Sequence, residues 1–197
     1  MRTVTGLYDD YEDARLAVDE LEAAGVPSND ISIVSNNVSG DRSNAAEGAG
    51  TGAGVGAVVG GAGGLLTGLG LMAIPGVGPV VAAGWLAATA AGAAAGAVAG
   101  GAAGGIIGAL TSSGVPEEDA NLYAEGVRRG GTLVTARVSD DFALEADAIL
   151  KRSNYVDPYE RRRAYTEEGW TRFDPTLDPY SSADIDRERD RWRQPLP

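Results

Sequence analysis

Residues 48–68 read GAGTGAGVGAVVGGAGGLLTG, a stretch with a glycine at every fourth position. A second ladder with the same interval runs over residues 84–108, with an alanine at one step. The members of the two ladders are Gly48, Gly52, Gly56, Gly60, Gly64, Gly68, Gly84, Ala88, Gly92, Gly96, Gly100, Gly104 and Gly108. Four residues turn an α-helix through about 400°, so each ladder predicts a helix with a groove free of side chains, where another helix can approach closely. We therefore expect residues 48–114 to form a glycine-zipper helical hairpin.

The turn of this hairpin is expected near residues 74–79. Pro75, Gly76, Gly78 and Pro79 lie within this short run, and no straight helix keeps two prolines and two glycines so close together. Each glycine in a water-exposed helix costs about 0.8–1 kcal/mol relative to alanine, so close packing must compensate for the ladders. Six steps of a ladder drift about 200° around the helix, which a single partner helix cannot cover. The ladders therefore predict a homo-oligomer.

The uncharged block of residues 48–116 contains no Asp, Glu, Lys, Arg, His, Asn or Gln. In a bilayer, residues 51–73 would span about 35 Å as a helix, against a hydrocarbon core of about 30 Å, and both termini would lie on the cytoplasmic side. Alternatively, hairpins from several subunits pack into a soluble bundle, because Gly and Ala contribute little hydrophobic area to drive insertion. The membrane is favoured here, since so long an uncharged block is hard to bury in a small protein.

The segment before the uncharged block reads as a βαβ unit. Within residues 1–35, alternation over 2–8 predicts a strand, and the next apolar residues follow the helical i, i+3, i+4 pattern until Gly25. The short β-branched run 31–34 predicts a second strand. Residues 36–47 are a polar linker that leads into the first glycine ladder.

The segment after the block, residues 115–156, reads as an αβαβ unit. Pro116 and the acids that follow it are typical of a helix start, residues 132–138 alternate as a strand, and a further helix leads to a brief strand at Tyr155 and Val156. Together the two segments predict an α+β fold, a ferredoxin-like αβ sandwich split by the inserted helical hairpin.

The C-terminal segment, residues 157–197, mixes eight Arg with ten acids and has no sustained apolar period. We expect a disordered tail. Its alternation of arginines and aromatic residues leaves a second interpretation open, in which the tail is a docking strip for a protein partner or a sister subunit.

Composition excludes several classes of function. The chain has no Cys and no His, which rules out Cys/His zinc sites, Cys–His dyads and Ser-His-Asp triads, and its net charge of −12 disfavours nucleic-acid binding. The letters of Gly68 to Ala73 fit a dinucleotide loop, but an expected helix precedes them and the next acid is Glu117. We therefore expect no catalytic residue, no metal and no cofactor.

Two charged clusters have plain structural interpretations. The acids over residues 9–13 and 117–119 lie at expected helix N-termini, where capping and the helix dipole favour them. Arg128 and Arg129 lie at an expected helix C-terminus, where cations are favourable, although such a pair can also grip an anion.

The chain resembles bacterial heat-induced or general stress proteins of the YflT-like kind. The resemblance is carried by Leu7-Tyr8, Ala14 to Gly25, Ile31 to Val34, the turn Ala73 to Pro79, Pro116 to Glu118 and Gly130 to Val134. It spans about residues 1–156 and implies the fold and a stress-linked role. It brings no catalytic motif, and the tail lies outside it.

The combined prediction is a non-enzymatic, stress-associated protein that oligomerises through the glycine-zipper hairpin, in or on the cytoplasmic face of the inner membrane. The first ten residues carry no secretion or lipidation signal, which favours a cytoplasmic start. The alternative is a soluble self-assembling structural or binding module in the cytoplasm, whose αβ domain recognises a partner or ligand.

Overall fold

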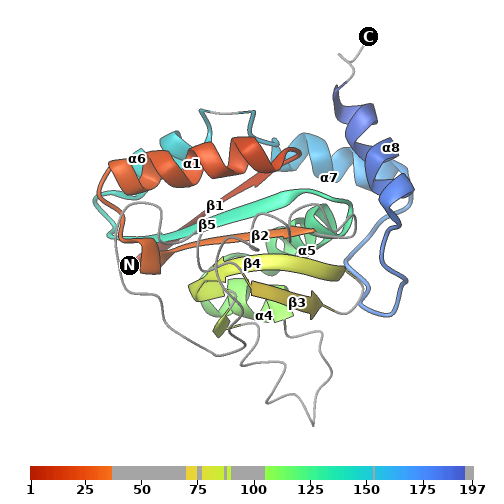
Figure 1. The fold of residues 1–197 in the computed structure, drawn as a ribbon, viewed down its shortest axis with the longest axis horizontal. Helices are drawn as coiled ribbons and strands as arrows, with labels where there is room; N and C mark the ends of the chain where they lie inside the picture. Colours follow the sequence, from red (N-terminus) through yellow and green to blue (C-terminus); the bar gives the residue numbers. More distant parts are fainter. Residues whose placement is uncertain (37–69, 75–76, 87, 90–104, 153, 194–197) are drawn as a thin grey trace.

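The computed structural model describes residues 1–36, 70–74, 77–86, 88–89, 105–152 and 154–193. Within these residues a five-stranded antiparallel sheet has the order β1-β5-β2-β4-β3, with helices on both faces (Figure 1). The strands are β1 Arg2–Tyr8, β2 Ile31–Asn36, β3 Gly70–Ile74, β4 Gly78–Gly84 and β5 Thr132–Val138. The helices are α1 Tyr11–Ala23, η1 Ser28–Asp30 (a 3-10 turn), α4 Gly105–Ser112, α5 Glu117–Arg128, α6 Ala143–Leu150, α7 Pro158–Glu167 and α8 Ser182–Arg193.

Strand β5 lies between β1 and β2 and joins the two halves of the chain into one domain. It pairs antiparallel with both neighbours, so β1, α1 and β2 form a βαβ unit split by β5. After α6, Tyr155 forms a bridge to Tyr8, and the Val156 N–H donates to the Leu7 carbonyl at 2.8 Å. This short pairing lies on the side of β1 away from β5 and completes a second split unit. The predicted ferredoxin-like αβ fold is confirmed for the two flanking segments.

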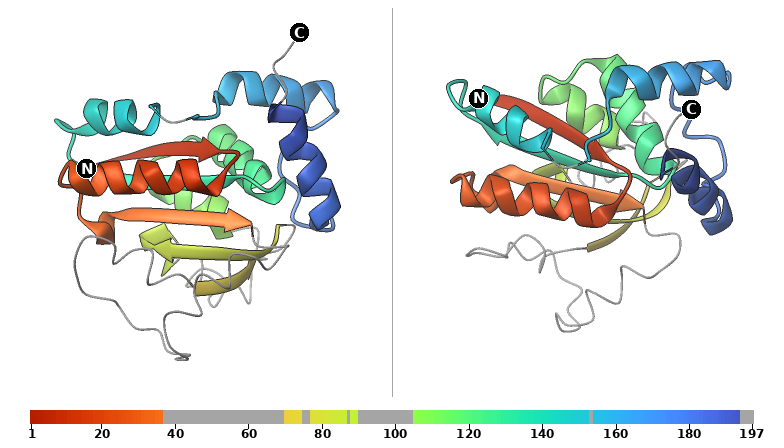
Figure 2. Two further views of the ribbon diagram at one scale, coloured as in Figure 1. Left: turned by 45° about the horizontal axis from the view of Figure 1, so that its top comes forward. Right: turned by 90° about the horizontal axis from the view of Figure 1, so that it is seen from above.

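The sheet is buried on both faces. Strand side chains alternate between the two faces, so neighbouring residues enter different core clusters. Leu7 and Leu133 belong to the cluster of buried residues beneath α4 and α5, whereas their neighbours Tyr8 and Val134 belong to the cluster beneath α1 and α6. Figure 2 shows α1 and α6 side by side on one face. The molecule therefore has three layers, and each layer of helices covers one face of the sheet.

The middle of the uncharged block forms strands instead of the expected helices. β3 and β4 are a β-hairpin, and β4 also pairs with β2 on its other side. The predicted helical hairpin is wrong over residues 70–74 and 78–84, which are strands, and the chain reverses between them. The reason is that each glycine weakens a helix, while pairing with β2 and burial of Val77 and Val80 stabilise the strands. The expected helix at the end of the block is present as α4.

The ladder positions that the structure describes do not form a helix-packing groove. Gly84 ends β4 with φ +88°, and a Cβ there would lie 2.1 Å from the Ile31 carbonyl oxygen, so this glycine permits close approach of two strands. Gly108 lies in α4 with nothing within 4 Å of an added Cβ, and Ala88 is exposed. The other ladder members lie outside the described residues, namely Gly48, Gly52, Gly56, Gly60, Gly64, Gly68, Gly92, Gly96, Gly100 and Gly104.

Two of the four predicted turn residues open β4. Gly78 lies opposite Ile74 and Pro79 opposite Ala73. The last β2 pair joins Asn36 to Val80, so Pro79 lies beyond the end of β2 and its missing N–H removes no bond to that strand. Pro75 and Gly76 lie outside the described residues. In the described parts of the chain, no helix combines the length and the apolar character that crossing a membrane requires.

The segment expected to be a disordered tail contains α7 and α8 and packs on the αβ domain. Tyr165, Phe173 and Ile185 are each at most 5% exposed. Only these few apolar residues are buried, at irregular spacing, so the segment shows no amphipathic period, and its order comes from contacts with the domain. Residues 194–197 lie outside the described range.

Candidate functional site

The C-terminal arm, defined here as residues 157–193, contacts the αβ domain at several places. At the first turn of α5, Arg162 Nη2 donates to Asp119 Oδ1 at 2.5 Å. At the end of α5, Arg189 Nη2 donates to the Gly130 carbonyl at 2.9 Å. At the end of β1, Arg161 forms a bidentate ion pair with Asp9. The junction between the arm and the domain is the candidate functional site.

Charges are paired at the end of α5, where the arm covers two arginines. The Glu125 carboxylate, with 1% of its side chain exposed, accepts from Arg129 Nε at 2.8 Å and from Arg128 Nη1 at 3.1 Å. Arg129 also reaches two carboxylates of the arm, Glu168 at 2.6 Å and Glu188 at 3.4 Å. The sequence left open that these arginines bind an external anion. In the structure the arm supplies the anionic groups, the carboxylates of Glu168 and Glu188.

Aromatic rings of the arm stack on the same guanidinium groups. The Arg129 guanidinium lies 3.9 Å from the ring centroid of Tyr165, and Arg128 lies 4.9 Å from that of Tyr180. Such contacts contribute about 0.5–2 kcal/mol each, with the larger values at desolvated positions. Burial raises the pKa of the Tyr165 hydroxyl to about 12, against the opposing effect of the nearby arginines. The hydroxyl therefore stays protonated well above neutral pH.

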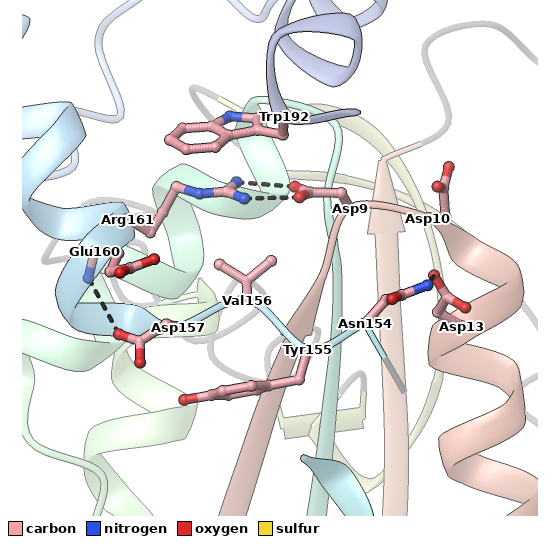
Figure 3. A pocket seen from close by; sticks show the side chains of 10 residues that line it. All are labelled: Asp9, Asp10, Asp13, Asn154, Tyr155, Val156, Asp157, Glu160, Arg161 and Trp192. Carbon is pink, nitrogen blue, oxygen red and sulfur yellow. Dashed lines mark hydrogen bonds and ion pairs between the residues drawn. The ribbon is translucent and has the colours of Figure 1, made fainter. Parts of the chain in front are cut away.

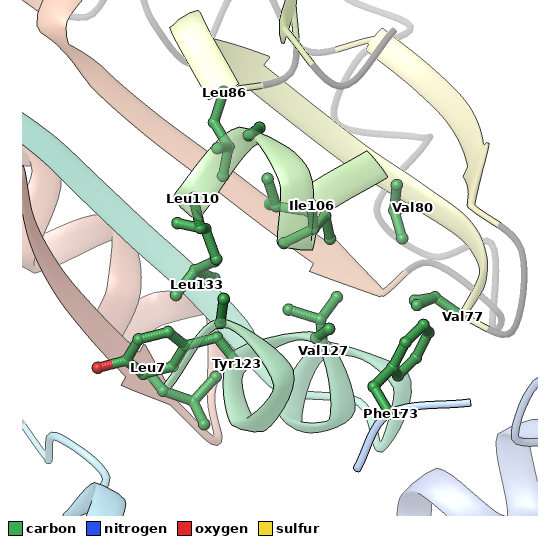
Figure 4. Close-up of a cluster of buried hydrophobic side chains, with 14 of the residues drawn as sticks. Leu7, Val77, Val80, Leu86, Ile106, Leu110, Tyr123, Val127, Leu133 and Phe173 are labelled. Atoms are coloured by element: carbon green, nitrogen blue, oxygen red, sulfur yellow. The ribbon is translucent and has the colours of Figure 1, made fainter. Parts of the chain in front are cut away.

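Apolar anchors complete the junction. Phe173 is 5% exposed and joins the core cluster that contains Val77 and Val127 (Figure 4). Its backbone N–H donates to Asn121 Oδ1 at 3.3 Å. Ile185 packs on Gly130 so closely that a Cβ there would lie 2.3 Å from Ile185 Cγ2. These anchors fix the position of the arm, because shape-matched apolar contacts tolerate little displacement.

An acid-lined hollow of about 470 Å³ lies between the arm and the start of α1 (Figure 3). Its lining includes five carboxylates, from Asp9, Asp10, Asp13, Asp157 and Glu160, and a single basic group, from Arg161. This charge repels anions and favours cationic groups. Within the described residues, no three Asp or Glu side chains are arranged to hold a metal ion.

Several acids of the hollow already have structural partners. Asp9 Oδ1 and Oδ2 accept from Arg161 at 2.8 and 2.7 Å, and Trp192 covers the Arg161 guanidinium at 3.8 Å. Asp157 Oδ1 caps α7 by accepting from the Tyr159 N–H at 2.8 Å. Sequence reasoning expected Asp9 or Asp10 to cap α1, but that N-terminus has no side-chain cap. Asp9 instead holds the arm.

Sequence reasoning missed most of the junction, although one signal was present. Glu125 precedes Arg128 and Arg129 by three and four residues, the spacing at which opposite charges pair on a helix. The Asp9–Arg161 pair spans 152 positions, so no local pattern could indicate it. Phe173 is one aromatic residue in a polar segment, and nothing near it in the sequence marks it as a core residue.

The fold and the junction define a ferredoxin-like αβ domain closed by its own C-terminal arm. The model of the heat induced stress protein YflT domain matches residues 3–74, which cover β1, α1, β2 and β3. The resemblance to YflT-like stress proteins is confirmed over this range and supports a stress-associated role; α5, β5 and the arm lie beyond it. No curated protein and no solved structure matches the chain.

Proposed function

We propose that this is a non-enzymatic, stress-associated protein that self-associates through its uncharged Gly/Ala-rich block. One observation carries the proposal. β3 is the last strand in the sheet order, and it belongs to a block without a single charged residue. Sheet edges usually carry charged residues or prolines that prevent pairing with another chain. An uncharged edge next to two glycine ladders is the composition expected of an assembly surface.

The geometry of the β-hairpin supports the same proposal. Gly70 lies opposite Ala82, so the chain before β3 and the chain after β4 leave the sheet at the same end. In the sequence, the first ladder ends at Gly68, just before β3, and the second starts at Gly84, the last residue of β4, so both connect to the sheet at this end. We propose that a neighbouring copy contacts both ladders.

The sequence left open a soluble bundle and a hairpin in the bilayer. The pairing of the β3–β4 hairpin with β2 fits the soluble assembly better than the transmembrane hairpin. A hairpin that crosses the bilayer would place its turn, near residues 74–79, on the far side of the membrane. That turn belongs to a β-hairpin whose second strand pairs with β2. Insertion with both termini on the cytoplasmic side would therefore require β3 and β4 to leave the sheet. A soluble module, with any lipid contact made at the cytoplasmic membrane surface, needs no such rearrangement.

The test is expression of the full chain without detergent, followed by membrane flotation, a high-pH wash and sedimentation of the soluble fraction. We expect a large soluble species, and any membrane-bound fraction should be released by the wash. Replacing Gly56 and Gly96 with Leu should reduce its mass, whereas the control Glu145→Leu adds apolar surface on the exposed side of α6 and should not. A monomeric wild-type protein would contradict self-association, and retention in washed membranes would favour the transmembrane version.

A further inference from the structure

We propose that the C-terminal arm is an autoinhibitory segment that limits the size of the assembly: its docking restrains the β3–β4 hairpin in the sheet, and its release loosens the hairpin and lets the assembly grow larger. The last step rests on the proposed function. The first step concerns described residues alone and can be tested separately.

The first connection between the arm and the hairpin is apolar. Phe173, from the arm, lies in the same buried cluster as Val77, which immediately precedes β4, and Val80 within it (Figure 4). Val77 and Val80 are both fully buried. Removal of Phe173 would leave a cavity beside the turn of the hairpin, and buried contacts that lose a partner lose stability in proportion to that cavity.

The second connection runs through the end of α5. Arg128 Nη2 donates to the Asp178 carbonyl of the arm at 3.2 Å. The Arg128 carbonyl accepts from Asn36 Nδ2 at 3.2 Å, and the same amide group is 3.4 Å from the Val77 carbonyl. One buried amide therefore ties the hairpin turn to the helix end that the arm covers. Two independent routes, one apolar and one polar, lead from the arm to Val77.

Besides its apolar anchors, the arm is attached by several ion pairs, which makes its docking responsive to ionic strength. Asp9 and Asp119, the acids of the domain that pair with the arm, keep 29% and 35% of their side-chain surfaces exposed, and Glu168 of the arm keeps 32%. Partly exposed ion pairs are screened by salt, whereas the apolar clusters that hold β1, β2 and β5 together are not. Rising ionic strength should therefore loosen the arm before it affects the centre of the sheet.

The decisive experiment is hydrogen exchange, read by mass spectrometry, on full-length Phe173→Ala. Exchange of amides over residues 77–84 should become roughly 5–150-fold faster, the range typical of coupling between two sites. Exchange over residues 2–8, in β1, should stay within about twofold of wild type. The matched control is Leu177→Ala, also in the arm, because Leu177 is 49% exposed and outside the core cluster.

A second measurement covers the case in which Phe173→Ala does not fold. Wild-type protein is compared in about 0.05 M and 1 M NaCl, where the screening length falls from more than 10 Å to about 3 Å. Peptides of the arm and of residues 77–84 should gain exchange together. If the arm exchanges faster while residues 77–84 stay protected, the autoinhibitory role is overturned.

Sedimentation of the same samples separates the two proposals. Faster exchange over residues 77–84 together with a larger assembly supports both. Faster exchange without any change in mass supports control of the hairpin by the arm and contradicts self-association as the function. Unchanged protection over residues 77–84 rejects the inference, whatever the mass of the assembly.

Discussion

Replacing Gly84 with alanine tests whether this ladder glycine serves a strand or a helix. Its backbone has φ +88°, a conformation that side chains other than glycine rarely adopt. An added Cβ would lie 2.1 Å from the Ile31 carbonyl oxygen and 2.7 Å from Ser32 Cα. Both neighbours are backbone atoms of β2, so no side chain can rotate away to make room.

The expected cost follows from these two effects. A left-handed conformation costs a residue with a Cβ about 1–2 kcal/mol, and forcing an atom into a packed site costs about 1–3 kcal/mol. Gly84→Ala should therefore reduce the free energy of unfolding by about 2–5 kcal/mol. For a chain of this length, each kcal/mol lowers Tm by about 2–4 °C, so we expect a fall of about 4–20 °C.

Thermal unfolding followed by circular dichroism measures the change, and Gly108, at the other end of the same ladder, supplies the control. Gly108 lies in α4 with nothing within 4 Å of an added Cβ, so Gly108→Ala should stabilise the protein by about 0.5–1 kcal/mol. If both glycines belonged to a helical ladder, the two substitutions would change the free energy of unfolding in the same direction. If Gly84→Ala is as stable as wild type, the pairing of β4 with β2 is not as described and the reasoning fails.

Three further substitutions probe the arm and the core. Glu125→Ala should destabilise the protein by about 1–3 kcal/mol in urea denaturation, because two buried guanidinium groups lose the carboxylate that they share while keeping their contacts with the arm. Glu125→Gln should cost less, and equal costs would contradict this. Asp9→Asn should lower the free energy of unfolding by about 1–3 kcal/mol, a cost limited by the partial exposure of Asp9. It should also speed proteolysis of the arm, and an unchanged cleavage rate would contradict the role of Asp9 in holding the arm. The folded-state pKa of Tyr165, about 12, exceeds the unfolded value near 10. The neutral hydroxyl therefore contributes its whole share to the free energy of unfolding below pH 10, and this share is lost as pH rises through 12. Tyr165→Phe should therefore flatten the fall in stability over that window by up to about 3 kcal/mol, and a wild-type slope in the variant would exclude Tyr165 as the cause.

The sequence allows most of the αβ domain to be predicted, because its elements carry local signals. The apolar positions of α1 follow the helical period, and Gly25, with φ +94°, lies just past its end. β5 alternates and proves to be an interior strand of the sheet, between β1 and β2. The brief strand expected at Tyr155 and Val156 is present only as an isolated bridge from Tyr155 to Tyr8, which closes the second split unit.

The hairpin and the arm could not be predicted because their structure depends on distant partners. The strand character of residues 70–84 comes from β2, which lies more than thirty residues earlier. The glycine interval that predicts a helix has no bearing on that pairing. The arm is ordered by Asp9, Arg129 and the core around Val127, and nothing in its own composition anticipates them. Long-range contacts overrode local propensity in both regions.

The position of β5 between β1 and β2 has a consequence for the order of events on the ribosome. Chains are made from the N-terminus, so β1, α1, β2 and the whole uncharged block emerge before the strand that joins β1 to β2 exists. During that interval the nascent chain exposes unpaired strand edges beside its most apolar segment. Pairings between residues as far apart as Arg2 and Val138 also give the domain a high contact order, which slows folding. The period of greatest aggregation risk therefore falls during synthesis, and we expect chaperone demand to end only when Phe173 and the rest of the arm have been made.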